Sequence, residues 1–132
     1  MSAINRSNIR RLYDSYQTPA WCIDGLLKKV VLSNIKSFYE PCRGVGNIYD
    51  KIQLPDHMKG WAEITQGRNY LEMEPPQVDL IITNPPYSLA KEFIIRALSH
   101  GKIVIMLLRL NFLESQAPYE FWQANAPSHL II

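Results

Sequence analysis

Apolar and polar positions follow two patterns along this chain, one typical of strands and the other typical of helices. Residues 78–83 and 102–108 are almost continuously apolar and rich in β-branched side chains. This pattern is typical of parallel strands that are covered on both faces. Shorter runs of the same kind predict strands at residues 37–40, 58–64 and 67–71, and the start of another at 128–132.

Two longer segments show helical spacing instead. The first begins at Thr18-Pro19, where Thr18 can cap the helix and Pro19 fits its first position. Its expected apolar face consists of Trp21, Leu26, Leu27, Val30 and Val31. The second is stopped by Gly101, and its expected apolar face consists of Leu89, Phe93, Ile94, Ala97 and Leu98. Shorter helices are expected from about Asn47 and over residues 118–123.

This order of elements predicts an α/β fold with a doubly wound, mostly parallel sheet. At 132 residues, the chain is expected to form a single domain, 1–132, in which residues 1–17 are a polar amino-terminal segment. Ligands of such sheets bind at the carboxyl ends of the strands. The loops to consider therefore follow Glu40, Glu63, Asn69 and Thr83.

Composition mainly excludes classes of protein. No apolar run reaches the roughly 20 residues that span a bilayer, and the amino terminus lacks a signal-peptide stretch, so we expect a cytoplasmic protein. Cys22 and Cys42 are expected to be reduced thiols, and the three dispersed histidines predict no metal site. The net charge is only +2, and Arg6, Arg10 and Arg11 either contact phosphates or form a solvated basic tail.

The most specific signal is a polar loop after the strand at 78–83, with the sequence Asn84-Pro85-Pro86-Tyr87. Prolines hold such a loop rigid and leave carbonyl oxygens as acceptors. An asparagine oxygen and a proline carbonyl can together accept both hydrogens of an exocyclic amine and stabilise the positive charge that develops on its nitrogen. Tyr87 offers a stacking face for a base. The alternative interpretation is a Pro-rich turn between a strand and a helix.

A second loop follows the strand at 37–40 and has the sequence Glu40-Pro41-Cys42-Arg43-Gly44-Val45-Gly46. Its glycines permit positive φ angles and close approach of a ligand, and free N–H groups at the turn suit an anion. Glu63 ends the next predicted strand, where a carboxylate can accept hydrogen bonds from both hydroxyls of a ribose. An ordinary loop and a solvated glutamate are the alternatives.

Together these residues resemble the motifs of the N6-adenine DNA methyltransferases, a family that uses S-adenosylmethionine. Asn84-Pro85-Pro86-Tyr87 resembles its motif IV, and Phe38 to Gly46 its motif I. Tyr16-Gln17-Thr18-Pro19 resembles motif X, which gives the motif order of the gamma-type enzymes. Residues 107–113 are similar to a segment of compact phage-type members, in which Arg109 would face phosphate or pair with a carboxylate; a buried strand and its exit loop are the equal alternative.

The resemblance implies a Rossmann-like methyltransferase core that transfers a methyl group to adenine N6 in DNA, after the target base has flipped out. The implied catalytic residues are Asn84, Pro85, Pro86 and Tyr87. The implied contacts of S-adenosylmethionine are Tyr16, Thr18, Pro19, Glu40, Pro41, Cys42, Gly44, Gly46, Glu63, Ile64, Asn69, Tyr70 and Asn84. Asn69 stands where the family usually has an aspartate, so that acceptor lacks a charge.

Three alternatives remain open from the sequence. Related enzymes use the same tetrad on RNA bases or on protein glutamine. The family has further carboxyl-terminal strands that this sequence lacks, and this favours an inactive or partial module that binds cofactor or DNA. A sheet without those strands is also expected to have an open edge, which is suited to self-association. A nicotinamide-binding fingerprint would need a third glycine where Tyr49 stands.

Overall fold

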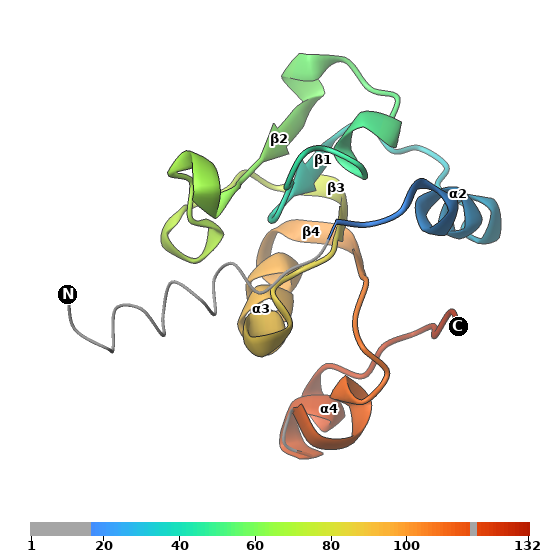
Figure 1. Cartoon of the computed structure of the whole chain (residues 1–132), viewed down its shortest axis with the longest axis vertical. Coiled ribbons are helices and arrows are strands. Elements are labelled where there is room, and N and C mark those ends of the chain that lie inside the picture. The colour runs from blue at the N-terminus through green and yellow to red at the C-terminus, as the bar shows by residue number, and fades with distance from the viewer. Residues whose placement is uncertain (1–16, 117–118) are drawn as a thin grey trace.

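A four-stranded, all-parallel sheet forms the centre of the molecule. The computed structural model describes residues 17–116 and 119–132. The strands are β1 (Phe38–Glu40), β2 (Lys59–Trp61), β3 (Val78–Thr83) and β4 (Gly101–Met106), in the spatial order β2-β1-β3-β4 (Figure 1). The prediction of an α/β fold with a parallel sheet is confirmed, and the arrangement is compatible with a Rossmann-like core.

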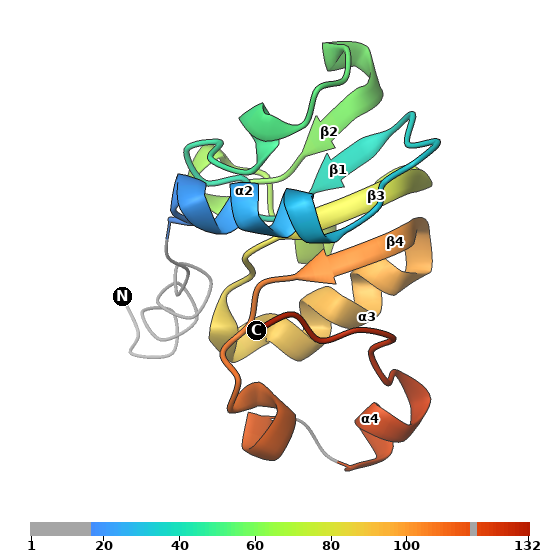
Figure 2. The same cartoon turned by 90° about the vertical axis from the view of Figure 1, so that its right-hand side faces the viewer.

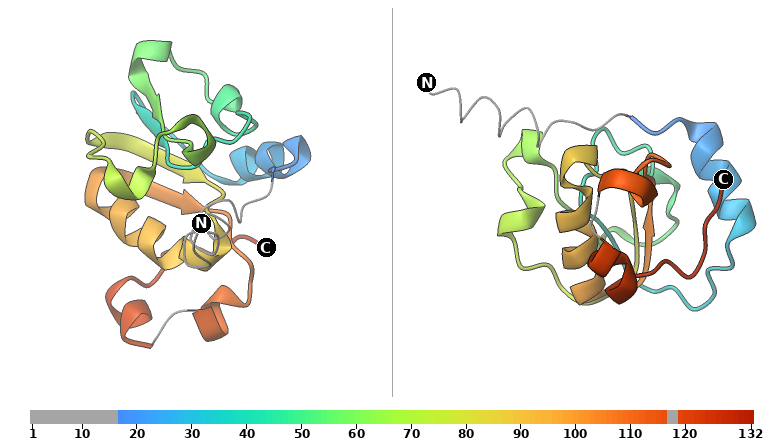
Figure 3. Two further views of the ribbon diagram at one scale, coloured as in Figure 1. Left: turned by 60° about the vertical axis from the view of Figure 1, so that its left-hand side comes forward. Right: turned by 90° about the horizontal axis from the view of Figure 1, so that it is seen from below.

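Two helices cover the two faces of this sheet. Helix α2 (Ala20–Lys29) lies on one face, and helix α3 (Ala90–His100) on the other (Figure 3). The α2 side is filled by a cluster whose buried members are Ile23, Phe38, Ile48, Ile52, Leu80 and Ile82. The α3 side is filled by Tyr39, Ala62, Tyr70, Val78, Ile81, Phe93 and Ala97. Because neighbouring strand residues point to opposite faces, β3 is buried on both sides, as its sequence predicts.

Strand β4 differs from its prediction. It ends at Met106 instead of Leu108, and Lys102 and Ile103 are exposed at its beginning. The reason is position: β4 is an outer strand of the sheet formed by the described residues, and α2 packs mainly over β1 and β3. A continuous apolar run therefore does not guarantee that both faces are covered.

Two predicted strands are absent from the described part of the chain. Residues 67–71 do not form one, because Gly67 adopts a left-handed conformation (φ 74°) and a short 3-10 helix, η4 (Tyr70–Glu72), follows. Only an isolated antiparallel bridge joins Glu63 to Arg68. Residues 128–132 are irregular and exposed, since no neighbouring strand pairs with them.

The predicted helix ends also needed correction. Helix α2 stops at Lys29, and its buried residue is Ile23, whereas Trp21 and Val31 are 77% and 89% exposed. Pro19 is the cap residue, without a side-chain cap bond from Thr18. In α3, Phe93, Ile94 and Ala97 are buried as predicted, but Leu98 is half exposed. The two short predicted helices correspond to a 3-10 turn, η1 (Tyr49–Lys51), and to α4 (Tyr119–Ala124).

The chain reverses its direction of winding between β1 and β3. From β1 it moves outward to β2, and then crosses to β3 on the other side of β1. All four strands point the same way, so their carboxyl ends meet at one edge (Figure 2). In open α/β sheets, the crevice beside such a reversal is where ligands bind.

Candidate functional site

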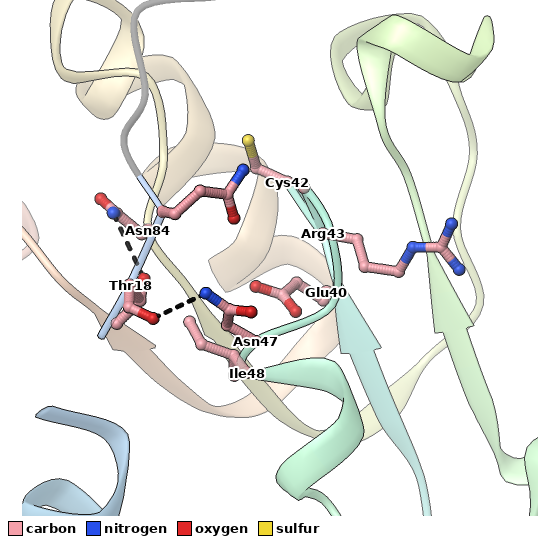
Figure 4. Close-up of a pocket in the computed structure, with 9 residues that line it drawn as sticks. Thr18, Glu40, Cys42, Arg43, Asn47, Ile48 and Asn84 are labelled. Carbon is pink, nitrogen blue, oxygen red and sulfur yellow. Dashed lines mark hydrogen bonds between the residues drawn. The ribbon is translucent and has the colours of Figure 1, made fainter. Parts of the chain in front are cut away.

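A pocket lies at this reversal, between the loops that follow β1 and β3. It brings together five of the residues that the sequence singled out: Thr18, Glu40, Cys42, Gly44 and Asn84. The rest of its lining is Gln17, Arg43, Asn47 and Ile48 (Figure 4). The cavity holds about 20 Å³, room for one water molecule and no more. A larger ligand therefore requires some of these side chains to move.

The loop after β1 depends on its glycines. Gly44 and Gly46 have φ angles of 59° and 99°, a region that other residues rarely adopt. A Cβ atom on Gly44 would lie 3.1 Å from the Gln17 side-chain oxygen, and one on Gly46 would lie 3.0 Å from the Asp50 carboxylate. The tight turn is closed by a bond from the Gly46 N–H to the Arg43 carbonyl.

Thr18 ties the two loops together across the pocket. Its hydroxyl accepts a hydrogen bond from Asn84 Nδ2 (3.4 Å), and its carbonyl accepts one from Asn47 Nδ2 (2.9 Å), as Figure 4 shows. These contacts explain why Thr18 is buried and does not cap α2. Asn47 and Gln17 were not expected in the site, although Asn47 directly follows the glycine turn.

Glu40 supplies a buried carboxyl group to this pocket. Its side chain is 1% exposed, and Oε2 accepts a bond from the Thr83 hydroxyl at 3.2 Å. Oε1 has no hydrogen-bond partner among the described residues. Burial raises the pKa of Glu40 well above its ordinary range, and the Thr83 hydroxyl only partly opposes this. A positively charged ligand group beside Glu40 would favour the ionised form.

The nearest arginine does not neutralise Glu40. The Arg43 guanidinium points away from the pocket toward β2 (Figure 4), where it lies 3.6 Å from the ring centre of Trp61. Arg68 lies over the same ring at 4.3 Å. These cation–π contacts fasten the loop after β1 to β2 and leave the acidic pocket floor without a direct ion pair among the described residues.

Glu63 lies next to the pocket and has a structural role. Its Oε1 accepts a bond from the Gly44 N–H at 2.9 Å, and its Oε2 accepts bonds from the backbone N–H and the hydroxyl of Thr65. It is 5% exposed and caps the 3-10 turn η3 (Ile64–Gln66). The sequence predicted that this carboxylate belongs to the site. Its hydrogen bond with Gly44 could not be predicted, because the two residues are brought together only by the pairing of β1 with β2.

The other implied cofactor contacts lie outside this pocket or outside the described residues. The Asn69 side-chain oxygen accepts a bond from Leu71 N–H and caps η4. Tyr70 is 1% exposed and belongs to the core, where its hydroxyl donates to His100. The pocket lining also excludes Pro19, Pro41, Gly46 and Ile64. Tyr16 and the arginines at 6, 10 and 11 fall outside the described residues.

The loop after β3 presents the Asn-Pro-Pro-Tyr sequence at the same edge. Asn84 is 5% exposed, and both prolines are fully buried. The Pro86 carbonyl accepts a bond from Leu89 N–H and closes the turn into α3. No backbone N–H of the described residues donates to the Pro85 carbonyl. The loop is thus rigid, with Asn84 facing the first pocket and Tyr87 facing a second cavity.

This second cavity, of about 160 Å³, opens on the far side of the loop. It is lined by Tyr87, Ser88, Ala90, Leu108, Arg109, Asn111 and Phe112. The Arg109 guanidinium lies over the Tyr87 ring, 4.7 Å from its centre. The sequence drew attention to both residues, but not to their contact.

Comparisons with known proteins do not assign the chain to a family. No family model matches the chain, and no curated protein or solved structure matches it significantly. Across residues 17–116 and 119–132, no group of three or more histidine, cysteine, aspartate or glutamate side chains is placed to hold a metal ion. In the same ranges, no helix has the length and apolar character to cross a membrane.

Proposed function

We propose that this chain binds S-adenosylmethionine at the pocket between β1 and β3 and transfers its methyl group to the N6 amine of adenine in DNA. The observation that carries the proposal is the meeting of Glu40, the Gly44 turn and Asn84 at the point where the winding of the sheet reverses. An acidic group, a glycine turn and an amine-binding loop are the three parts such a reaction requires.

In this proposal, Glu40 binds the ammonium group of the cofactor's methionine part. The cofactor carboxylate then needs N–H donors from the glycine turn. The N–H groups of Gly44 and Gly46 already donate to Glu63 and to the Arg43 carbonyl, which leaves Val45 N–H for the carboxylate. Because the pocket is closed, the Gln17 side chain, whose end lies against Gly44, must move aside when the cofactor enters.

The reaction itself is a direct displacement. The adenine N6 lone pair forms a bond to the sulfonium methyl carbon, the carbon–sulfur bond breaks, and S-adenosylhomocysteine and a proton leave. The Asn84 side-chain oxygen and the Pro85 carbonyl accept the two amine hydrogens, which stabilises the charge that develops on nitrogen. Catalysis is therefore positioning and charge stabilisation, and in a duplex the base must first flip out.

The test measures transfer of a radioactive methyl group from S-adenosylmethionine to adenine-containing DNA. Asn84→Ala should lower the rate by about 100-fold or more, the usual cost of losing one group that stabilises transition-state charge. Binding of S-adenosylhomocysteine should stay within a few-fold of wild type. The control is Gln53→Ala, at an exposed position away from the pocket. Equal loss of transfer and binding in Asn84→Ala would contradict the role of Asn84.

A second candidate function is cofactor or DNA binding without transfer. The Arg109 guanidinium favours it, because it lies 4.7 Å from the centre of the Tyr87 ring and covers the face on which a target base would stack. Cofactor binding with no methyl transfer to DNA, RNA or glutamine-containing protein would favour this candidate. Transfer to RNA or protein alone would replace DNA as the substrate and leave the pocket assignment intact.

A further inference from the structure

A column of alternating cations and aromatic rings lies beside β2 and the loop after β1. The Lys59 ammonium lies 4.0 Å from the centre of the Tyr49 ring, and the Arg43 guanidinium lies 5.7 Å from that same centre. The centre of the Trp61 ring lies 3.6 Å from the Arg43 guanidinium and 4.3 Å from that of Arg68. Two guanidinium groups this close to one ring centre cannot share a face, so Trp61 lies between Arg43 and Arg68. We refer to these five residues as the cation–aromatic stack.

Within the described residues, the positive charges of this stack are not neutralised by a carboxylate. None forms an ion pair with Arg43, Lys59 or Arg68. Asp50 and Asp56 lie near enough to influence the tyrosine of the stack, but they pair with none of its cations. Like charges held this close repel one another, so an anion that contacts several of them at once is bound more strongly than by one alone.

Hydrogen bonds hold both guanidinium groups in place. Arg43 Nη2 donates to Gln66 Oε1 at 3.2 Å, and Arg68 Nε donates to the Trp61 carbonyl at 3.0 Å. Arg68 also lies close to Tyr39. A guanidinium has five N–H donors, so each arginine keeps others for a ligand, and this fork of donors matches the oxygens of a phosphate. Because the stack already fixes these side chains, binding costs them less rotamer freedom.

The same contacts decide which kind of anion fits. Cations cover both faces of Trp61, so this ring offers no face on which a base could stack. A peptide strand finds the edge of β2 occupied as well. The Lys59 carbonyl accepts a bond from the Tyr49 hydroxyl at 3.3 Å, and the Trp61 carbonyl accepts the bond from Arg68. A partner is therefore recognised through spaced negative charges, which favours the phosphates of a nucleic-acid strand over an acidic peptide.

We propose that the cation–aromatic stack binds the phosphodiester backbone of a nucleic-acid strand, with phosphates contacted by Arg43 and Arg68. This goes beyond the proposed function, because neither cofactor nor adenine is required. Arg43 points away from the pocket between β1 and β3, so the two sites are separate (Figure 4). Trp61 ends β2, two strands away from β3 and Asn84. That is roughly 10 Å, since neighbouring strands are about 4.8 Å apart, so a strand bound here can continue toward Asn84.

The experiment measures binding of a short, fluorescently labelled oligothymidylate to the full chain, without cofactor, by anisotropy over a range of salt concentrations. This probe has backbone phosphates but no adenine. For a single strand, the slope of log affinity against log salt concentration becomes shallower by about 0.7 for each phosphate contact that is lost. Arg68→Met should reduce the slope by this amount and weaken binding at low salt roughly threefold to fivefold, the worth of one exposed ion pair. Arg68→Lys, which keeps the charge, should keep the slope.

Two further variants separate the stack from the total charge of the chain. Trp61→Leu removes no charge but takes away the ring that holds both arginines, so it should weaken binding about as much as Arg68→Met. Lys28→Met removes an exposed positive charge on α2, outside the stack, and is the control that should behave like wild type. The arginines of the amino-terminal segment 1–17 are present in every variant, so differences between variants report on the stack.

Three results would overturn the inference. They are absence of oligothymidylate binding at low salt, equal behaviour of Arg68→Met and Lys28→Met, and equally effective displacement of the probe by polyglutamate of the same length. Circular dichroism shows whether each variant is folded, and the two Arg68 variants remain informative if Trp61→Leu is not. The probe needs neither cofactor nor adenine, so failure here leaves the pocket between β1 and β3 untouched, and failure of methyl transfer leaves these titrations valid.

Discussion

The buried carboxyl group of Glu40 lowers the stability of the ligand-free chain when it is ionised, and it is suited to bind a cationic ligand. Its buried carboxyl has a pKa well above the ordinary value, chiefly because of burial. The folded chain thus holds this proton more tightly than the unfolded chain does. Stability is therefore lost as pH rises from the unfolded pKa of Glu40 to its raised folded pKa. A cationic ligand reverses the balance by favouring the carboxylate.

We therefore predict that Glu40→Gln raises the melting temperature of the ligand-free chain by a few degrees above that pH window. The same change should weaken S-adenosylhomocysteine binding by about tenfold or more, since a charge-assisted hydrogen bond is worth about 1.5–3 kcal/mol. Thermal unfolding and calorimetry at several pH values measure the two effects. Glu92→Gln, at an exposed carboxylate on α3, is the control. A lower melting temperature together with unchanged binding would contradict this description of Glu40.

The segment before α2 joins the two loops of the pocket, a role that the sequence alone does not show. Thr18 accepts hydrogen bonds from both Asn84 and Asn47. We predict that Thr18→Val lowers methyl transfer by roughly threefold to tenfold, the worth of one hydrogen bond, because Asn84 loses its orientation. Thr18→Ser, which keeps the hydroxyl, should retain the wild-type rate. Steady-state rates at saturating cofactor distinguish the two variants; equal rates in both would contradict the orienting role.

The sequence predicted those elements whose signal is local. Strand β3 and its Asn-Pro-Pro-Tyr loop were predicted correctly because a β-branched run and two prolines act on their own backbone. The strand at 67–71 was wrong because the left-handed turn at Gly67 redirects the chain. Trp21 was misplaced because the orientation of α2 is decided by Ile23 packing on Phe38 and Leu80, which lie far along the sequence. The Arg109–Tyr87 contact likewise depends on two strands meeting at one edge.

At the scale of the whole molecule, the sheet formed by the described residues has an open edge along β4. The outward-facing backbone groups of this six-residue outer strand have no strand beyond them in residues 17–116 and 119–132, and Ile103 is 38% exposed. Long outer strands with exposed apolar residues tend to pair with other chains. We predict self-association at micromolar concentrations, measured by sedimentation velocity. Ile103→Lys should shift the distribution to monomer, whereas Ile95→Lys on exposed α3 surface should not. A strict monomer in the unmodified chain would contradict this prediction.

The pocket between β1 and β3 is the centre of the proposed function, and calorimetric titration with S-adenosylmethionine and S-adenosylhomocysteine tests it most directly. Micromolar binding is predicted. It should be lost in Gly44→Val, because a side chain there is strained at φ 59° and its Cβ would press on Gln17. Gly25→Ala, with open space around its Cβ, is the matched control and should bind normally. Absence of binding by a folded wild-type chain, or normal binding by Gly44→Val, would contradict the assignment of this pocket to the cofactor.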